Sequence, residues 1–151
     1  MTTDELLAAI RDALASDTAL DTWCRAQFAK PATIFIGIDE KNPPAESDYP
    51  LVSLTGVTHD RGDYTQEISW DVFLGIGVVN ETITTSGNKQ TAEGLLQAEA
   101  MRELAENAIF RARIASTKSS GLSSTESYYP LYVSYTALTM SVLKSSRRAL
   151  P

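Results

Sequence analysis

Histidine and cysteine are the first residues to consider, because their side chains supply most proton-transfer and nucleophilic chemistry near neutral pH. The only histidine, His59, precedes Asp60, but no serine, cysteine or second base is placed beside it by spacing. It falls in a predicted turn at residues 59–63, which is too exposed to solvent to favour acid–base catalysis. The only cysteine, Cys24, stands beside Trp23 in an apolar helical pattern and is expected to be a core residue. We therefore expect no catalytic residues and predict that the chain is not an enzyme.

Three short motifs match binding signatures by letter but lack the context that those signatures need. Gly75 and Gly77 resemble the start of a dinucleotide-binding fingerprint, yet they fall inside a predicted strand and Asn80 occupies the third glycine position. Residues 87–91 place a glycine and a lysine before a helix without the spacing of a phosphate-binding loop. Residues 61–63 spell Arg-Gly-Asp, which turn chemistry explains. With a single histidine as well, we expect no cofactor and no metal ion.

The composition predicts one folded domain over residues 1–151. Hydrophobic residues make up 43% of the chain and charged residues 21%, which is ordinary globular usage. No apolar run approaches the roughly 18 residues of a membrane span. The first five residues are polar and acidic, where a secretion signal would be basic and then apolar. These features predict a cytosolic protein with no membrane partner.

Charge is unevenly distributed along the chain, whose net charge is -6. An acidic body repels phosphates, so sequence-specific nucleic-acid binding is not expected. The last third, residues 101–151, carries 7 basic and 3 acidic residues and could pair with an acidic surface on a partner or a neighbouring copy. Arg111 and Arg113 also suit the C-terminus of a helix, where cations are favoured. Arg147 and Arg148 fall outside any predicted helix and are candidate contact residues.

Two helices and a strand are predicted at the N-terminus. Thr2 and Glu5 have the spacing of a capping box, and apolar residues follow at steps of three and four. Asp17 can cap a second, shorter helix, which Pro31 ends because proline lacks the backbone donor. A strand is expected at residues 33–38.

The clearest strand spans residues 66–79. The six even positions after residue 66 are all apolar, which predicts a long strand with one face on a core. Residues 49–58 are rich in β-forming residues and are expected to pair with it as an antiparallel hairpin. Gly75 and Gly77 share the second face and leave a bare strip there, onto which the long helix or another subunit could pack.

The longest helix is expected at residues 91–115. Its apolar stripe comprises Ala98, Met101, Leu104, Ala105, Ala108, Ile109 and Ala112, and its opposite face comprises Glu99, Arg102, Glu103, Glu106 and Arg113. Leu96, Phe110 and Ile114 fall outside the stripe, among the charges. Two interpretations stay open for them: they are scattered surface residues, which are common, or they form a second surface that another chain contacts.

Polar segments at residues 39–48, 80–90 and 116–127 are expected to be loops, the last one a flexible Ser/Thr-rich connector. A final long strand is predicted at residues 128–143. The predicted fold class is therefore α+β, with about four mainly antiparallel strands and with the long helix and the N-terminal helices packed on one face.

This order of elements resembles the tail terminator, or tail completion, proteins of long-tailed bacteriophages and prophages, such as the lambda-type minor tail protein U. The likeness covers nearly the whole chain. It runs from the amphipathic helix through the aromatic short helix with Trp23 and Phe28, Pro31 and the alternating hairpin to the Ala-rich helix and the last strand. It rests on the order and length of the elements, because no signature motif is present.

The resemblance implies a ring. Terminator proteins assemble, typically as hexamers, on the head-proximal end of the tail tube, stop its polymerisation and present a surface to the neck. The implied partners are other copies of the chain, the tail tube protein and a neck or connector protein. The implied location is the host cytoplasm during assembly and then the tail of the virion. We also expect at least one of the three polar loops to order only on docking.

Such a ring needs two different complementary surfaces on each subunit. The acidic and basic parts of the chain, together with Leu96, Phe110 and Ile114, are the candidates. Two alternatives stay open: another phage neck or head-completion protein, and a small α+β domain that binds a ligand or catalyses a simple reaction. The ligand-binding alternative needs a concave pocket with converging polar groups, whereas the terminator needs an exposed protein-contact surface.

Overall fold

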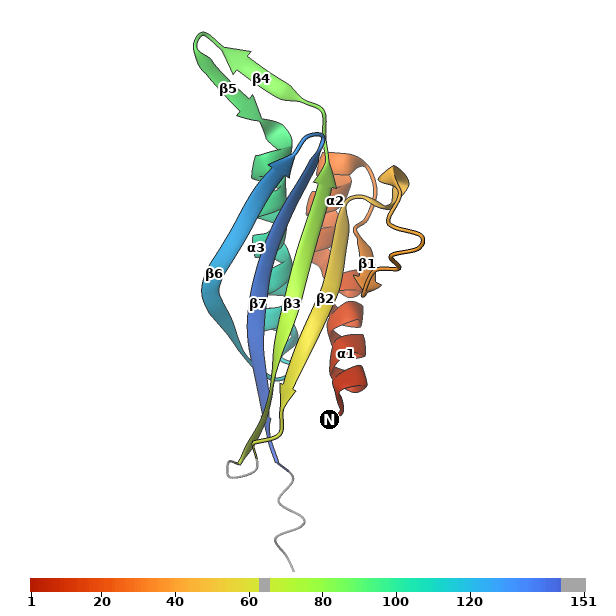
Figure 1. Cartoon of the computed structure of the whole chain (residues 1–151), viewed down its shortest axis with the longest axis vertical. Helices are drawn as coiled ribbons and strands as arrows, with labels where there is room; N and C mark the ends of the chain where they lie inside the picture. The colour runs from red at the N-terminus through yellow and green to blue at the C-terminus, as the bar shows by residue number, and fades with distance from the viewer. Residues whose placement is uncertain (63–65, 145–151) are drawn as a thin grey trace, which may run out of the picture.

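A computed structural model describes residues 1–62 and 66–144 (Figure 1). Three α-helices pack on one face of a mixed five-stranded sheet, and a separate two-stranded hairpin extends from one end. The helices are α1 (Thr3–Ser16), α2 (Thr18–Phe28) and α3 (Glu93–Ala112). The strands of the sheet are β1 (Thr33–Ile36), β2 (Leu51–Asp60), β3 (Glu67–Val79), β7 (Leu131–Leu143) and β6 (Ser116–Tyr128), in that spatial order. The hairpin consists of β4 (Ile83–Ser86) and β5 (Lys89–Ala92).

The predicted α+β class, with the helices packed on the sheet, is confirmed. The sheet has five strands rather than about four, and it is mainly antiparallel because only the β1–β2 pair is parallel. Strand β3 lies at the centre and pairs with β7 along its whole length, from Glu67 opposite Leu143 to Val79 opposite Leu131. The predicted antiparallel hairpin is the β2–β3 pair.

The ends of the first two helices follow the predicted capping chemistry. The Glu5 backbone N–H donates to the Thr2 hydroxyl at 3.3 Å, and the Thr2 N–H donates to the Glu5 carboxylate at 3.3 Å. The Asp17 carboxylate accepts a hydrogen bond from the Leu20 N–H at 2.9 Å. Helix α2 ends at Phe28, followed by Ala29 in the left-handed conformation (φ 61°).

The core lies between the sheet and the helices. Strand β3 contributes its even positions from residue 70 onward, all at most 2% exposed: Trp70, Val72, Leu74, Ile76 and Val78. Helices α1 and α3 contribute Leu6, Ile10, Leu14, Met101, Ala105 and Ile109, and β7 contributes Tyr132, Leu138 and Met140. Cys24 is fully buried in this core, as predicted. The alternation in β3 therefore fixes which face of the sheet the helices cover.

Two segments predicted as loops form strands. Residues 80–90 contain most of the β4–β5 hairpin, and residues 116–127 form nearly all of β6, an edge strand bonded to β7. Both segments are largely exposed on both faces. Apolar alternation arises only where one face of a strand is buried, so these polar strands give no periodic signal. The last strand accordingly starts at Leu131 and not at residue 128.

Helix α3 is shorter than predicted and its polar face is different. Arg113 adopts the left-handed conformation (φ 50°) and ends the helix, so Ile114 lies beyond it and packs against the core. Arg102, predicted to face solvent, is only 7% exposed. In the part of the chain that the structure describes, no helix is long and apolar enough to cross a membrane.

Candidate interaction surfaces

The face of the sheet without helices carries an apolar groove of about 680 Å³. Three large side chains line it and remain exposed: Phe73 from β3 (40%), Leu122 from β6 (78%) and Tyr135 from β7 (44%). Backbone and hydroxyl groups of Thr55, Gly56, Ser124 and Thr136 complete its walls. We refer to Phe73, Leu122 and Tyr135 as the sheet-face patch.

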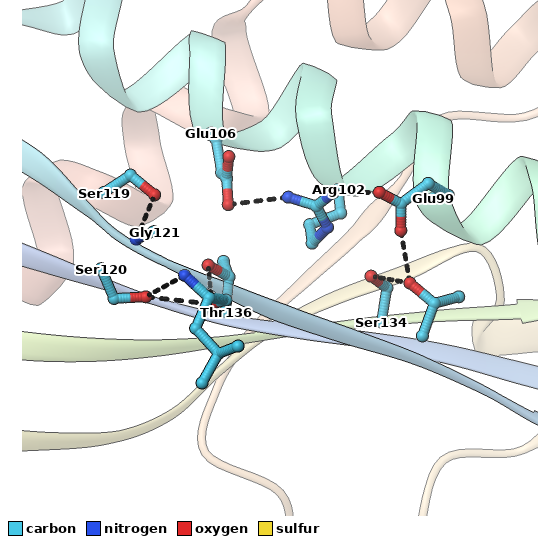
Figure 2. A network of polar contacts seen from close by, with 10 residues as sticks. Glu99, Arg102, Glu106, Ser119, Ser120, Gly121, Ser134 and Thr136 are labelled. Atoms are coloured by element: carbon cyan, nitrogen blue, oxygen red, sulfur yellow. Dashed lines mark hydrogen bonds and ion pairs between the residues drawn. The ribbon is translucent and has the colours of Figure 1, made fainter.

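A bend in β6 places Leu122 in this groove. The pairing with β7 shifts between Ser119 and Ser123, and Gly121 takes a positive φ of 76° that favours glycine. The Ser120 hydroxyl donates to the Leu122 carbonyl at 3.0 Å, and the Thr136 hydroxyl approaches the same carbonyl at 3.4 Å (Figure 2). The bend is therefore held by side-chain hydrogen bonds, and it keeps a large apolar residue in solvent.

Strand β6 is also tied to helix α3 by a polar network centred on Arg102 (Figure 2). Its guanidinium forms an ion pair with Glu106 at 3.0 Å and a second one with Glu99. Glu99 in turn accepts a hydrogen bond from the Thr125 hydroxyl of β6, which lies 2.9 Å from the Ser134 hydroxyl of β7. Arg102 is buried because β6, which the sequence pattern did not reveal, covers this side of the helix.

The network favours the charged forms of Glu99 and Arg102. The hydrogen bond from Thr125, followed by the contact with Arg102, holds the pKa of Glu99 below its usual 4.5. Burial opposes the charge on Arg102, but the two glutamates outweigh it and raise its pKa. The Arg102 Nε–H has no hydrogen-bond partner among the described residues. The charged network fixes the position of β6 at the edge of the sheet.

Gly75 and Gly77 lie on the uncovered face of the sheet, but the strip between them is not bare. A β-carbon at residue 77 would stand 2.5 Å from the ring of Tyr49, and one at residue 75 would stand 3.2 Å from the Thr55 methyl group and 3.5 Å from the Tyr135 ring. Side chains of the same chain pack against both glycines, and a hollow of about 200 Å³ remains beside them. The long helix lies on the opposite face of the sheet, so that half of the prediction is wrong, and a contact with another subunit stays a prediction.

The other predicted contact residues are dispersed. Leu96 is 57% exposed near the start of α3, and Phe110 is 36% exposed in its last turn. Ile114 belongs to the partly buried layer against the core, because the helix ends before it. Arg147 and Arg148 lie outside the described residues. Only Leu96 and Phe110 thus occupy the exposed positions that the helical wheel predicted.

The β4–β5 hairpin projects away from the sheet at the end where β7 and α3 begin (Figure 1). Its bonds to the rest of the molecule lie at its base, where the Thr84 hydroxyl donates to Glu93 at 2.8 Å and the Glu93 N–H donates to the Thr82 carbonyl. Isolated two-stranded hairpins are only marginally stable in water. Contact with another molecule would therefore stabilise the β4–β5 hairpin.

A second hollow of about 1060 Å³ lies between α1, α2 and α3, on the helical side. Small residues line much of it, and Trp23 and Leu104 contribute apolar surface. The ion pair between Arg111 and Asp17 (2.8 Å) joins α3 to the α1–α2 junction at its wall. The alanines leave the hollow wide, and its polar lining residues are Ser16, Asp17, Thr18, Thr22 and Arg111.

His59 and Cys24 both pack against other side chains of the fold. The His59 ring stacks on Trp70 with centroids 5.0 Å apart, and its Nδ1 lies 3.5 Å from the Thr3 hydroxyl. Burial, aided by the nearby Asp21 charge, raises the pKa of the Cys24 thiol to about 11, so it stays protonated at neutral pH. Among residues 1–62 and 66–144, no group of three or more His, Cys, Asp or Glu side chains is placed to hold a metal ion.

Sequence reasoning missed the sheet-face patch, although two signals for it were present. Leu122 is the only large apolar residue in the Ser/Thr-rich segment 116–127, and Phe73 interrupts the polar and glycine positions of β3. Neither family models nor curated protein sequences match the chain.

Proposed function

We propose that the chain is the tail terminator of a long-tailed phage or prophage. In this role it forms a ring on the head-proximal end of the tail tube, stops polymerisation of the tube and presents a surface to the neck. The observation that carries the proposal is the sheet-face patch, because the fold holds Leu122, Phe73 and Tyr135 in solvent on a face that no helix covers.

Exposed apolar groups that share a groove favour a protein partner over water. Burying a large apolar side chain contributes roughly 1.5–3 kcal/mol, so covering three of them supplies a substantial part of a binding free energy. Contiguous exposed patches of this kind mark protein-contact surfaces. We assign the sheet-face patch to the contact that is buried when the terminator joins the tail tube.

A ring subunit needs further, non-identical surfaces for its two neighbours. The chain offers exposed apolar residues well away from the groove, on the helical side and at the end that carries the hairpin: Leu96, Phe110, Ile83 and Tyr129. Surfaces of different composition on different sides support head-to-tail association, in which a closed ring is one outcome. The resemblance to terminator proteins makes a hexamer the expected ring.

Deletion of the coding sequence from the parent phage or prophage tests the proposal. We expect tail tubes of uncontrolled length that do not join heads, and restoration of normal tails by a plasmid copy. Tails of normal length that stay unjoined would instead assign the chain to another neck or head-completion role. Infectious particles with normal tails would contradict both assignments.

The groove also keeps a ligand-binding function as a second candidate. Its volume of about 680 Å³ lies within the range of small-molecule pockets, and hydroxyl groups line one wall. A small-molecule screen by thermal unfolding tests this alternative, since a ligand at 100 times its Kd stabilises the folded state by about 2.7 kcal/mol. A hit whose effect is lost in Leu122→Asp would favour the ligand-binding function.

A further inference from the structure

The helix-free face of the sheet is uncharged where its two hollows meet. The groove of about 680 Å³ and the hollow of about 200 Å³ share Thr55 and Tyr135 as lining residues, so they adjoin. Among the described residues that line them, none is Asp, Glu, Lys or Arg. The whole chain carries a net charge of -6. Two copies can therefore meet at this face without the like-charge repulsion that opposes self-association of an acidic chain.

Two irregularities in strand pairing lie at the same level of the sheet, on either side of the central β3–β7 pair. The pairing of β2 with β3 shifts just before Gly56, which lies opposite Phe73. The pairing of β6 with β7 shifts between Ser119 and Ser123, opposite Ala137. Four residues that line the groove thus follow one another across the sheet at this level, and we call them the central row: Gly56, Phe73, Ala137 and Leu122.

The central row alternates between small and large side chains, and this alternation is self-complementary. Phe73 is 40% exposed and Leu122 is 78% exposed, whereas the other two residues are a glycine and an alanine. A two-fold axis that runs along the strands between β3 and β7 reverses the order of the row. Leu122 of each copy then lies over Gly56 of the other, and Phe73 lies over Ala137. Every large side chain faces a small one, which allows two sheets to pack closely.

We propose that the free chain is a dimer in which a second copy covers the helix-free face, with the two sheets packed face to face about this two-fold axis. The contact buries the sheet-face patch of both copies, because Tyr135 lies next to the central row in the same groove. Sheets packed face to face keep their strands within about 30° of each other, so the central row determines how the copies align. The dimer goes beyond the proposed function: a tail tube would compete with the second copy for the same patch.

The charges nearest to the central row do not oppose the contact. In the neighbouring row, Asp71 pairs with Thr139, which pairs with Lys118. The Asp71 carboxylate accepts hydrogen bonds from the hydroxyls of Thr139 (2.8 Å) and Thr58 (3.4 Å). Across the two-fold axis, Asp71 and Lys118 of the second copy each lie one strand away from Asp71. Two cations and two carboxylates thus meet in this row, which leaves it neutral.

The oligomeric state tests the contact. Sedimentation equilibrium should give twice the mass of one chain at high protein concentration, and added salt should not dissociate the dimer, because apolar contacts are not screened. Leu122→Asp should raise the dimer dissociation constant at least about tenfold, because a carboxylate then faces apolar groups. The matched control, Leu96→Asp, adds the same charge at an exposed leucine of α3 and should dimerise like the wild type.

Exchange of large and small residues tests the two-fold arrangement. Phe73→Ala leaves small residues facing each other, and Ala137→Phe leaves large residues facing each other, so each variant alone should dimerise at least about tenfold more weakly. In an equimolar mixture every phenylalanine of the row faces an alanine again, and mixed dimers should form with a dissociation constant close to that of the wild type. Thermal unfolding checks that each variant is folded, and Leu122→Asp keeps the contact testable if Ala137→Phe is not.

A wild type that stays monomeric at every concentration tested would overturn the inference. A dimer that Leu122→Asp leaves unchanged, or a mixture of folded variants that associates no better than each alone, would also overturn it. If the purified chain stops tube growth but never dimerises, the proposed function stands and this contact is wrong. If the dimer is confirmed but tails lacking the chain are normal, the contact stands and the proposed function is wrong.

Discussion

The ring of Tyr49 lies against Gly77 so closely that a β-carbon at residue 77 would stand 2.5 Å from its Cε1 atom and 3.0 Å from its Cδ1 atom. Tyr49 lies two residues before β2 and thus covers part of the helix-free face of the central strand. Tyr49 is itself half-buried, and burial raises the pKa of its phenol. This contact is intramolecular, so the glycine serves packing within one subunit.

Gly77→Ala should therefore destabilise the fold. The added methyl group forces the Tyr49 ring to move, and overpacking of this kind costs about 1–3 kcal/mol. Urea unfolding at pH 7 measures the change. The matched control is Gly56→Ala, whose β-carbon would lie 3.7 Å from Phe73 in ordinary contact and should change the free energy of unfolding by less than about 0.5 kcal/mol. Equal effects of the two substitutions would contradict the packing argument.

Asp17 should make a pH-dependent contribution to stability. Burial opposes its charge, but hydrogen bonds from Arg111 and the Leu20 N–H outweigh this effect and hold its pKa below 3.8. A depressed pKa means that the contribution is present above pH 3.8 and is lost as the pH falls through the lower folded value. Arg111 is 52% exposed, so solvent screens much of the pair.

Asp17→Ala removes both the cap and the ion pair, and should cost about 1–2 kcal/mol at pH 7. Asp17→Asn retains a good capping side chain and should cost at most about 1 kcal/mol. Urea unfolding of the two variants and the wild type, measured from pH 7 down to pH 3, should show the wild-type advantage over Asp17→Asn shrinking below pH 4. An advantage that stays constant across this range would exclude the ionised carboxylate as its source.

Removal of Arg102 should destabilise the chain more than any surface substitution. Arg102→Met leaves Glu106, whose side chain is only 13% exposed, without its cation. Breaking a buried pair in this way costs about 3 kcal/mol. The double variant Arg102→Met with Glu106→Gln should recover part of this loss, because the uncompensated charge is gone. If the double variant loses as much stability as Arg102→Met and Glu106→Gln lose in sum, the two residues act independently.

The sequence predicts well the elements that bury one face. The apolar even positions of β3, the capping residues Thr2 and Asp17, and the stripe of α3 apart from the exposed Ala112 are all found in the structure, because they specify contacts with a single core. Strand β6 is different, because it is exposed on both faces and is held by backbone pairing with β7 and by the network around Arg102. Both depend on residues distant in sequence, which no local period reveals.

The contact surfaces are predictable only in part. The wheel places Leu96 and Phe110 correctly in solvent, but it extends the helix past Arg113 and so misplaces Ile114. The sheet-face patch requires the bend at Gly121, because the shift in register there takes Leu122 out of the regular pairing with β7. A lone leucine in a run of serines is the signal that sequence reasoning can use in similar cases.

Leu122→Asp should leave the fold intact and impair capping of the tail tube. The side chain is 78% exposed, so the free energy of unfolding should change by less than about 0.5 kcal/mol. Leu143→Asp is the matched control, because Leu143 is 74% exposed but lies outside the groove. Binding of each variant to preformed tubes, measured by co-sedimentation, should fall at least about tenfold for Leu122→Asp only. Equal binding by both variants would show that the sheet-face patch does not form the contact with the tube.

The most direct test of the proposed function is the length of tail tubes grown with and without this chain. Tube protein from the same phage or prophage is polymerised in vitro, the purified chain is added during growth, and the tubes are imaged by electron microscopy. We predict that elongation stops on addition and that a ring lies at one end of each tube. Tubes that continue to grow at the same rate, with no ring at either end, would contradict it.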